Sequence, residues 1–251
     1  MSAPGDEHDE ARRLRAAWDE RGRSAGRDFY VASHPGWDDP QRRLVQARVD
    51  ADMLLHGLTD RLSALDVLEI GCGVGRLAAL IAPRARSYTG LDIAPSMLAE
   101  ARARHGALAG ARFLECDGLG VPAAARDRSY GLVFAHAVLI HCPRAVCAAW
   151  LASALDVLAP GGELRCQLRA DPSDPGGLAA AAPAAVIDVW AQQAEAAARP
   201  VELELALPPD YMGHAFGWED AQQLVREVAR GPADLLRLDP AHLYIRIVRP
   251  A

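Results

Sequence analysis

The sequence predicts an α/β protein with a doubly wound, mostly parallel sheet, and three observations support this prediction. From about residue 65, short apolar runs alternate with segments of helical spacing, as in chains whose parallel strands are joined by helices. A glycine-rich turn at residues 71–75 follows the first of these strands, where open parallel sheets bind ligands. The chain has 251 residues, of which 51% are hydrophobic, and this is enough for one large core.

The order of the elements follows from apolar spacing and from the turn residues between them. Residues 1–10 are expected to be disordered, residues 10–22 and 40–58 to be helical, and the segment between them to be an aromatic-rich loop. Strands are expected at residues 65–70, 87–93, 111–117, 129–137 and 161–169. The helices between them are expected at residues 76–82, 95–106 and 145–160. This alternation places the carboxyl ends of the five strands along one edge of the sheet.

The last third of the chain departs from this alternation. Residues 171–200 begin as a Pro/Gly linker and continue as an Ala-rich helical insertion. A helix is expected at residues 218–230. The strand-like runs 233–238 and 242–248 are the candidates for the closing strands, with 201–207 as the alternative.

Composition excludes several classes of protein. The net charge is −6 and the chain has no lysine, which argues against a partner of nucleic acid. The five cysteines are an odd number without C-x-x-C spacing, which indicates reduced thiols and a cytoplasmic location. No metal site, no membrane span and no signal peptide are predicted from the sequence.

An acidic residue, Glu69, stands at the end of the first strand and just before Gly71, Gly73 and Gly75. The dinucleotide pattern G-x-G-x-x-G would need its third glycine at position 76, where this chain has arginine. A carboxylate about 4 Å from a phosphate costs on the order of 4 kcal/mol at an effective dielectric near 20, whereas it attracts an ammonium or a sulfonium. The turn is therefore predicted to bind a ligand that carries positive charge.

Two further carboxylates follow the next two strands. Asp92 ends the second strand, where a carboxylate can accept hydrogen bonds from both hydroxyls of a ribose. Asp117 ends the third strand, where it could accept a hydrogen bond from the exocyclic amine of an adenine. The three acids together indicate an adenosine ligand with a cationic end.

With these motifs in place, residues 65–170 resemble a class I S-adenosylmethionine-dependent methyltransferase of the small-molecule type. The runs that carry the resemblance, in the family's order, are VLEIGCGVG, GLDIAPSML, FLECDG and VLAPGGEL. It implies a Rossmann-like sheet of seven strands with the last antiparallel. It also implies a core at residues 61–170, between an N-terminal tail and helical cap at residues 1–60 and a lid insertion, last helix and closing strands at residues 171–251.

The resemblance further implies S-adenosylmethionine as cofactor and S-adenosylhomocysteine as product. The residues implied to bind the cofactor are Glu69, Gly71 and Gly73 at the methionine end, Cys72 and Gly75 in the same turn, Asp92 and Ile93 at the ribose, Met97, Asp117 and Gly118 at the adenine, and Ala135 and His136 after strand four. One departure is Gly131, which stands where the family usually has an aspartate. That aspartate is commonly structural, so we expect altered hydrogen bonding near Gly131 rather than a different cofactor.

The segment after strand four, residues 134–143, is expected to distinguish between acceptors. It lacks the Asn- or Asp-Pro-Pro-aromatic run of base methyltransferases, a Pro-Cys nucleophile and the paired glutamates of protein arginine methyltransferases. We therefore expect a small-molecule acceptor, methylated at O, N or C, and no nucleic-acid or membrane partner. His141 is the candidate general base, because an imidazole can take a proton near neutral pH.

Residues outside the core are expected to cover the acceptor, with Tyr30, Trp37, Tyr211 and His214 as the candidates. Trp18, at helical spacing from Leu14, is expected to be core. Two other functions remain open on the sequence: a nicotinamide-dependent oxidoreductase, and a non-catalytic module that binds S-adenosylmethionine. The sequence is compatible with a monomer or a homodimer.

Overall fold

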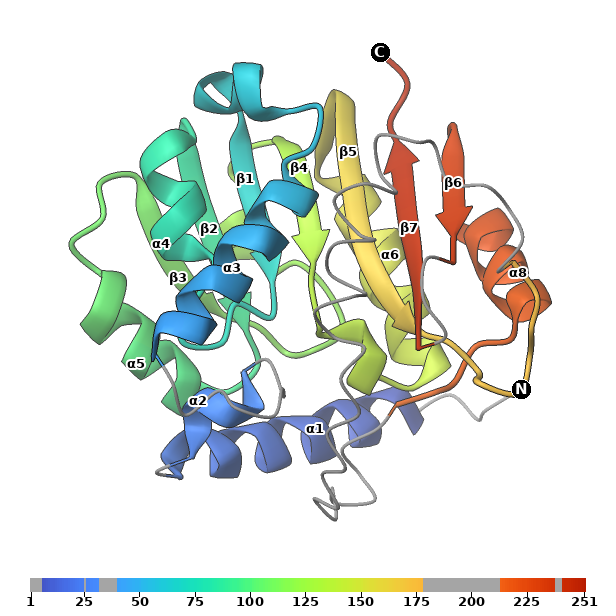
Figure 1. The fold of residues 1–251 in the computed structure, drawn as a ribbon, viewed down its shortest axis with the longest axis horizontal. Helices are drawn as coiled ribbons and strands as arrows, with labels where there is room; N and C mark the ends of the chain where they lie inside the picture. The colour runs from blue at the N-terminus through green and yellow to red at the C-terminus, as the bar shows by residue number, and fades with distance from the viewer. Residues whose placement is uncertain (1–5, 25, 32–39, 178–212, 238–240) are drawn as a thin grey trace.

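A seven-stranded sheet runs through the computed structural model, which describes residues 6–24, 26–31, 40–177, 213–237 and 241–251. Its strands are β1 (Asp66–Ile70), β2 (Ser87–Asp92), β3 (Ala111–Glu115), β4 (Tyr130–Ala135), β5 (Leu158–Arg169), β6 (Ala233–Leu236) and β7 (His242–Val248). The strand order is β3-β2-β1-β4-β5-β7-β6, and β1 to β5 are parallel (Figure 1). The order changes direction between β1 and β4, which is where open α/β sheets bind their ligands.

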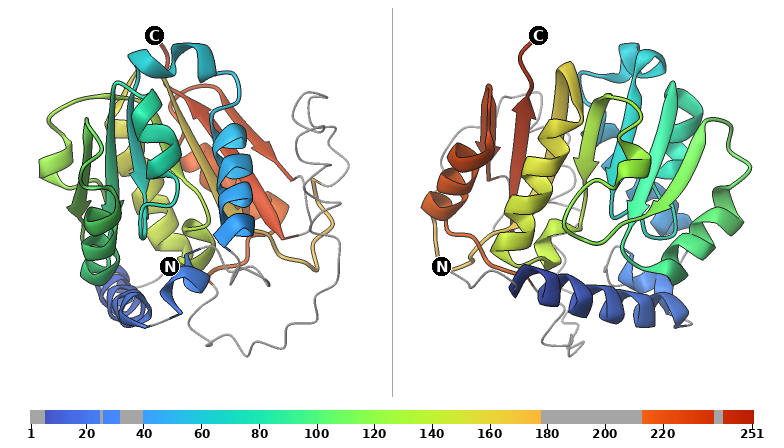
Figure 2. Two further views of the ribbon diagram at one scale, coloured as in Figure 1. Left: turned by 60° about the vertical axis from the view of Figure 1, so that its left-hand side comes forward. Right: turned by 180° about the vertical axis from the view of Figure 1, so that it is seen from behind.

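Helices cover both faces of the sheet, because successive strand residues point to opposite sides. Leu68 and Val133 belong to the cluster on one face, and their neighbours Val67 and Leu132 belong to the cluster on the other. The first cluster packs against α6 (Arg144–Asp156) and α8 (Trp218–Val228); the second packs against α3 (Pro40–Leu54), α4 (Ala78–Ile81) and α5 (Pro95–His105) (Figure 2). Hydrophobic burial on both faces therefore fixes the plane of the sheet and the position of its ligand-binding edge.

The N-terminal helix α1 (Asp6–Arg23) lies across the edge of the sheet toward which β4 and β5 point (Figure 1). The expectation of disorder through residue 10 is therefore wrong for residues 6–10, which form the first turns of this helix. The expected loop after α1 also begins differently, because Arg27–Tyr30 forms the short helix α2. The charged run at residues 6–10 shows no apolar spacing, so periodicity alone misses the start of α1.

The C-terminal strands complete the sheet as expected. β7 is antiparallel to β5 over the register Glu163–Val248 to Arg169–His242, and β6 pairs with β7. Residues 201–207, the alternative strand, and the Ala-rich insertion from residue 178 to residue 200 lie outside the described residues. Within the described parts of the chain, no helix is both long and apolar enough to cross a bilayer.

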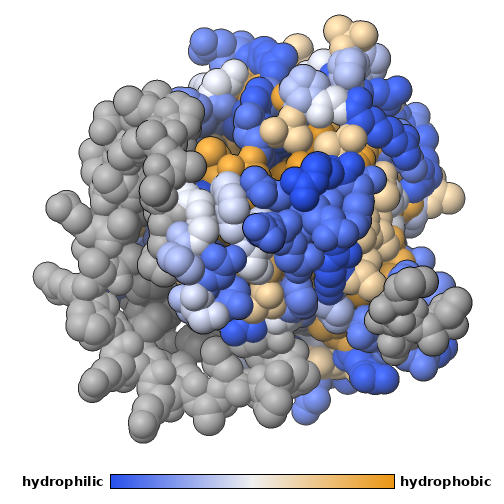
Figure 3. All heavy atoms as spheres, turned by 90° about the vertical axis from the view of Figure 1, so that its right-hand side faces the viewer, coloured by the Kyte–Doolittle hydropathy of each residue, from blue (hydrophilic) through white to orange (hydrophobic). Residues whose placement is uncertain are grey.

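The helix α8 shows how the outer layer is built. It buries Ala221, Leu224 and Val225 against the sheet, while the surface seen from its side is largely hydrophilic with small hydrophobic areas (Figure 3). Asp220 and Glu227 on this helix accept hydrogen bonds from Arg144 at the start of α6. The two helices on this face are thus joined by polar contacts as well as by packing.

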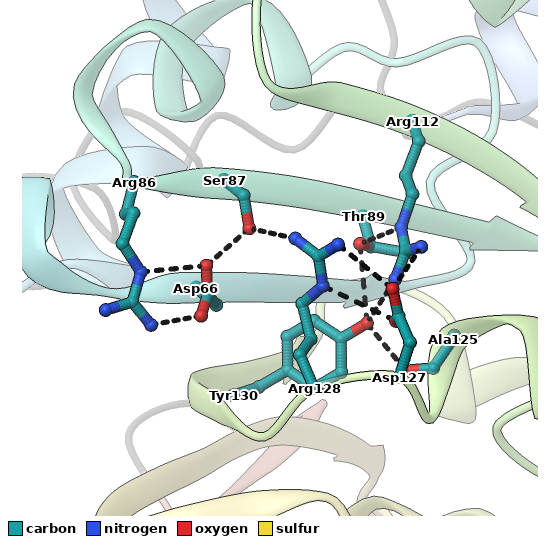
Figure 4. A network of polar contacts seen from close by, with 9 residues as sticks. All are labelled: Asp66, Arg86, Ser87, Thr89, Arg112, Ala125, Asp127, Arg128 and Tyr130. Carbon is teal, nitrogen blue, oxygen red and sulfur yellow. Dashed lines mark hydrogen bonds and ion pairs between the residues drawn. The ribbon is translucent and has the colours of Figure 1, made fainter.

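A polar network holds the amino ends of the strands, away from the predicted ligand-binding edge (Figure 4). Asp66 accepts hydrogen bonds from Arg86 and Ser87, and Asp127 accepts hydrogen bonds from Arg112 and Arg128. Gly131 follows Tyr130 in this network and stands where the resemblance implied an aspartate. A Cβ built on Gly131 would lie 2.6 Å from Cδ2 of Leu65, so a side chain there would clash with it.

Candidate functional site

A cavity lies at the carboxyl ends of β1, β2 and β4, beneath α1 and α2. It is partly open to solvent and mostly apolar, as expected of a pocket for a small organic ligand. Its lining comprises Leu14, Trp18, Tyr30, Val31, Ile70, Gly71, Gly73, Asp92, Ile93, Met97, Cys116, Gly118, His136, Ala137, Val138, His141, Cys142, Val146 and Trp150. The cavity therefore joins the glycine turn, the ribose-binding acid and the segment after β4.

The glycine turn forms one wall of the cavity, and all three of its glycines have a positive φ. Gly71 and Gly73 have φ angles of 71° and 52°, which residues with a side chain rarely adopt. A Cβ on Gly71 would also lie 2.4 Å from Cγ2 of Val138, so the Val138 side chain packs directly against the backbone of Gly71. Gly71, Gly73 and Val138 all line the cavity.

Asp92 stands at the end of β2 and organises the turn. Its Oδ2 accepts a hydrogen bond from the Gly73 N–H at 2.7 Å, and its Oδ1 accepts one from the Ala94 N–H at 2.8 Å. Burial raises the pKa of Asp92 to about 6, although the two N–H groups oppose this shift. The carboxyl is only 7% exposed, yet it lines the cavity, so it can hold the turn and still face a ligand.

Glu69 is placed differently from the expectation. It is 4% exposed, does not belong to the lining of the cavity, and accepts a hydrogen bond from the hydroxyl of Tyr88. Burial raises its pKa to about 7, although the Tyr88 hydroxyl and Arg76 oppose this shift. The position of the side chain therefore gives no support to a contact between Glu69 and the cationic end of a ligand.

A buried charged cluster lies beside the cavity and was not expected from the sequence. Asp50 of α3 forms an ion pair with Arg76, the residue directly after the glycine turn, and accepts a hydrogen bond from Gln46 Nε2 at 2.8 Å. Nε2 of His136 lies 3.3 Å from Oδ2 of Asp50. Burial opposes ionisation of Asp50, but His136 and Arg76 outweigh it and hold its pKa well below the usual range.

His141 stands at the other end of the cavity, in the short helix η4 (Leu139–His141). It is 6% exposed, and its ring packs edge-on against Trp18 of α1, with 5.1 Å between the ring centroids. A second, more open cavity shares Leu14 and His141 with the first and reaches His214. His141 thus lines both cavities.

Residues 67–162 match the family model of a methyltransferase domain. The chain carries a methyltransferase domain. A comparison of the sequence with curated proteins gives no significant match.

The fold matches solved structures along nearly the whole chain. The DhpI–SAH complex has 18% identity and a TM-score of 0.58, over 97% of this chain and 98% of that one. Magnesium protoporphyrin IX methyltransferase from Synechocystis PCC 6803, with bound SAM, has 17% identity and a TM-score of 0.60, over 99% of this chain and 100% of that one. N-methyltransferase NodS from Bradyrhizobium japonicum WM9, with SAH, has 16% identity and a TM-score of 0.57, over 94% and 98%. The chain therefore has the fold of these methyltransferase structures, and its residues 67–162 match a methyltransferase domain.

The structure brings about half of the predicted site residues together. Those that line the first cavity are Gly71, Gly73, Asp92, Ile93, Met97, Gly118, His136, His141 and Tyr30. Those outside its lining are Glu69, Cys72, Gly75, Asp117, Ala135 and His214. Asp117 is exposed and accepts a hydrogen bond from the Leu119 N–H, and His214 lines only the second cavity. Trp37 and Tyr211 lie outside the described residues.

Several lining residues were missed. Leu14 and Trp18 line the cavity, and both also pack against hydrophobic clusters, as expected for Trp18. Helical spacing cannot distinguish a face that meets only the core from a face that also meets a ligand. Cys116 lines the cavity in place of its neighbour Asp117. For Asp50, no motif in the sequence signals a site.

Proposed function

We propose that this protein transfers the methyl group of S-adenosylmethionine to a small-molecule acceptor and releases S-adenosylhomocysteine. The observation that carries the proposal is the cavity beside Gly71, Gly73 and Asp92 within a methyltransferase domain. The cavity fits the cofactor, because Asp92 offers carboxylate oxygens to a ribose and the two glycines leave backbone free for the methionine part. Ile93 and Met97 add apolar surface for the adenine.

The bound cofactor would supply a methyl group already activated on a sulfonium. The protein then has to align the acceptor and keep water out, which can contribute about 7–11 kcal/mol. Leu14 and Trp18 of α1 close the cavity with apolar side chains. The segment after β4 is held in a defined shape, because the Ala137 N–H donates to Oε1 of Gln167 at 2.9 Å.

We infer that His141 takes the proton that an O–H or N–H acceptor loses. Its support is its place between the two cavities, with the second cavity as the space for the acceptor. The acceptor's atom, O, N or C, is left open by these contacts. The neighbours named as magnesium protoporphyrin IX and N-methyltransferases support an acceptor of the small-molecule class.

Thermal unfolding with S-adenosylmethionine, S-adenosylhomocysteine, NADH and NADPH tests the cofactor. A ligand at 100 times its dissociation constant stabilises by about 2.7 kcal/mol, which is about 5–11 °C for a domain of this size. We expect this rise with the two sulfur ligands only. Asp92→Ala should weaken their binding by about 1.5–3 kcal/mol. A rise with a nicotinamide alone, or unchanged binding by Asp92→Ala, would contradict the proposal.

The base is tested once an acceptor has been found in a screen that follows S-adenosylhomocysteine release. His141→Ala should lower turnover while its affinity for S-adenosylhomocysteine stays that of the wild type. His8→Ala, on an exposed position of α1, is the matched control. Normal turnover of His141→Ala would exclude His141 as the base.

We propose a cytoplasmic location and a monomer or homodimer. The support for the location is that all five cysteines are free and buried, as in proteins of a reducing compartment. Light scattering after size-exclusion chromatography measures the oligomeric state, and a trimer or larger assembly would contradict this proposal.

A further inference from the structure

The short helix α2 and the residue after it cover the glycine turn. Tyr30 and Val31 line the first cavity, and so does Met97 of α5. Val31 packs against the small hydrophobic cluster to which Met97 belongs, and a Cβ built on Gly73 would lie 3.5 Å from its Cγ1. A ligand in this part of the cavity therefore meets α2 and α5 as well as the glycine turn.

α2 cannot hold this position by itself. It has four residues, Arg27–Tyr30, and a helix this short is not stable in isolation. Of residues 27, 28, 30 and 31, none is buried. The placement of α2 over the cavity must therefore come from its contacts with neighbouring elements.

Ion pairs join α2 to α5, which lie side by side (Figure 1). Nη1 of Arg27 lies 2.7 Å from Oε2 of Glu100, and Oδ1 of Asp28 lies 3.0 Å from Nη2 of Arg104. Glu100 and Arg104 stand one turn apart on α5 and pair with each other at 2.7 Å. The four side chains thus form a chain of alternating charge that begins at Arg27 and ends at Asp28, both on α2.

These ion pairs can hold α2 in place and can also open. The four side chains are 27–35% exposed, so water and dissolved salt reach them. A single pair of this kind shifts an equilibrium by about fivefold or less, and salt weakens it. The linked pairs together favour the closed position of α2, but none of them is strong enough to make that position permanent.

Two further cations contact α2 from other elements. Arg43 of α3 lies 3.8 Å from Oδ2 of Asp28, and the Arg21 guanidinium of α1 lies 5.9 Å from the ring centroid of Tyr30. These contacts join α2 to α3 and to α1, and neither of them involves α5. The contacts of α2 with α5 can therefore be altered while the others remain.

Resting on the proposed function, we propose that the ion pairs of α2 with Glu100 and Arg104 are a latch over the cofactor site, and that S-adenosylmethionine and S-adenosylhomocysteine pass only when it opens. The pairs join protein groups and need no ligand to form, so opening has to precede entry as well as exit. Closure excludes water from the site, and opening releases the product. Glu100 and Arg104 are thus positioning residues that act on the ligand through Tyr30 and Val31.

A latch has a kinetic signature that a simple binding contact lacks. When entry and exit both pass through the open form, a change that favours opening raises the association and dissociation rate constants by the same factor. Their ratio, the dissociation constant, then stays the same, whereas the loss of a contact that only strengthens binding changes dissociation alone. Stopped-flow tryptophan fluorescence measures both rate constants, because Trp18 and Trp150 line the cavity.

Loss of the Glu100 charge tests the latch. Glu100 pairs with both Arg27 and Arg104, so we expect Glu100→Gln to raise both rate constants of S-adenosylhomocysteine about threefold to tenfold. The dissociation constant should stay within about twofold of the wild type. Glu227→Gln, which removes a partly exposed ion pair with Arg144 on α8, is the matched control and should leave both rate constants unchanged. A rise in dissociation alone would overturn the proposal.

A second variant acts from the other side of the same ion pair. Arg27→Gln removes the cation on α2 and leaves α5 unchanged, so the test does not depend on the folding of Glu100→Gln. We expect both rate constants to rise again. In the double variant the rise should be smaller than the product of the two single rises, because both substitutions remove one shared contact. Wild-type rate constants in Arg27→Gln, or a full product in the double variant, would contradict the latch.

Ionic strength tests the latch without a substitution. S-Adenosylhomocysteine carries one ammonium and one carboxylate, so it has no net charge that would steer its association. Between about 0.02 M and about 0.5 M sodium chloride we expect both rate constants of the wild type to rise about threefold to tenfold, and those of Glu100→Gln to rise less. Rate constants of the wild type that do not respond to salt would overturn the proposal.

Failure of the latch differs from failure of the proposed function. If S-adenosylhomocysteine does not bind to the wild-type protein, the cofactor assignment fails as a whole. If it binds and its rate constants respond neither to Glu100→Gln nor to Arg27→Gln nor to salt, only the inference about the latch fails.

Discussion

At the scale of single residues, burial decides which acids of the site can ionise. Glu69 and Asp92 stand at the ends of adjacent strands, and burial raises the pKa of both, to about 7 and about 6. Asp50 is equally buried, but its pKa is held low by Arg76 and His136. The two aspartates therefore differ in pKa: Asp50 loses its proton far more readily than Asp92 does.

The raised pKa of Glu69 predicts a stability that depends on pH. The folded protein binds the proton of Glu69 more tightly than the unfolded chain does, so the free energy of unfolding falls as pH rises from about 4.5 to about 7. Glu69→Gln keeps an acceptor for the Tyr88 hydroxyl and removes this dependence on pH. Its free energy of unfolding in urea should exceed that of the wild type by more at pH 8 than at pH 4.5. The difference between the two pH values should be on the order of 3 kcal/mol.

The matched control for this prediction is Glu219→Gln, at an exposed position of α8. Its difference from the wild type should be the same at both pH values. The same difference for Glu69→Gln at both pH values would mean that the pKa of Glu69 is not raised in the folded protein.

Residue types and their order along the chain were sufficient to place Gly71, Gly73 and Asp92 at one cavity, because their backbone conformation and strand position are local. The direction of Glu69 could not be predicted, because Tyr88 reaches it from the neighbouring strand. Asp50 could not be predicted either, because only the packing of α3 brings it to the glycine turn.

At the scale of elements, α1 is the cover of the cavity and is fixed to the start of α5. The Ser96 N–H donates to Oδ1 of Asp19, and the Ser96 hydroxyl donates to the Asp19 carbonyl, each at 2.8 Å. Arg15 adds an ion pair with Glu115 at the end of β3. The helix that places Leu14 and Trp18 over the cavity is therefore held at one end by few polar contacts.

Removal of the Asp19 side chain should loosen α1 without unfolding the sheet. Asp19→Ala leaves the Ser96 N–H without its acceptor, and the loss of such a capping contact costs about 1 kcal/mol. Hydrogen exchange in residues 6–23 should then be about fivefold faster, because about 1 kcal/mol changes an equilibrium by that factor. Exchange in α8 should be unchanged.

Glu20→Ala is the control for this prediction, since Glu20 is the next residue of α1 and is exposed. It should leave the exchange of residues 6–23 as in the wild type. If Asp19→Ala also leaves that exchange unchanged, the contacts with Ser96 do not hold the cover.

The alternation of strands and helices predicted all five parallel strands to within a few residues, because each strand is a short apolar run between turn signals. The closing pair β6 and β7 followed from alternate apolar residues such as Leu243, Ile245 and Ile247, which are all buried. The first turns of α1 were missed because they carry charge and no apolar stripe.

At the scale of the whole molecule, one hydrophobic cluster covers each face of the sheet. The cavity lies at the edge formed by the carboxyl ends of the strands. All the cysteines lie within the two clusters. Cys72 belongs to one cluster, and Cys116, Cys142, Cys147 and Cys166 belong to the other. Burial raises the pKa of Cys116, Cys142 and Cys166 to about 12, and the pKa of the remaining two well above the ordinary value.

Thiol reactivity should therefore report the integrity of the whole fold. A thiol reacts as the thiolate, so we expect the native protein to react slowly with Ellman's reagent and all five thiols to react in urea. Cys116 and Cys142 line the cavity, so S-adenosylhomocysteine should slow their modification further, whereas NADH should not. Mass spectrometry of the labelled peptides identifies the sites. A thiol that reacts rapidly in the native protein would show that its hydrophobic cluster opens without global unfolding. Equal protection by NADH would contradict the assignment of S-adenosylmethionine as the ligand of this cavity.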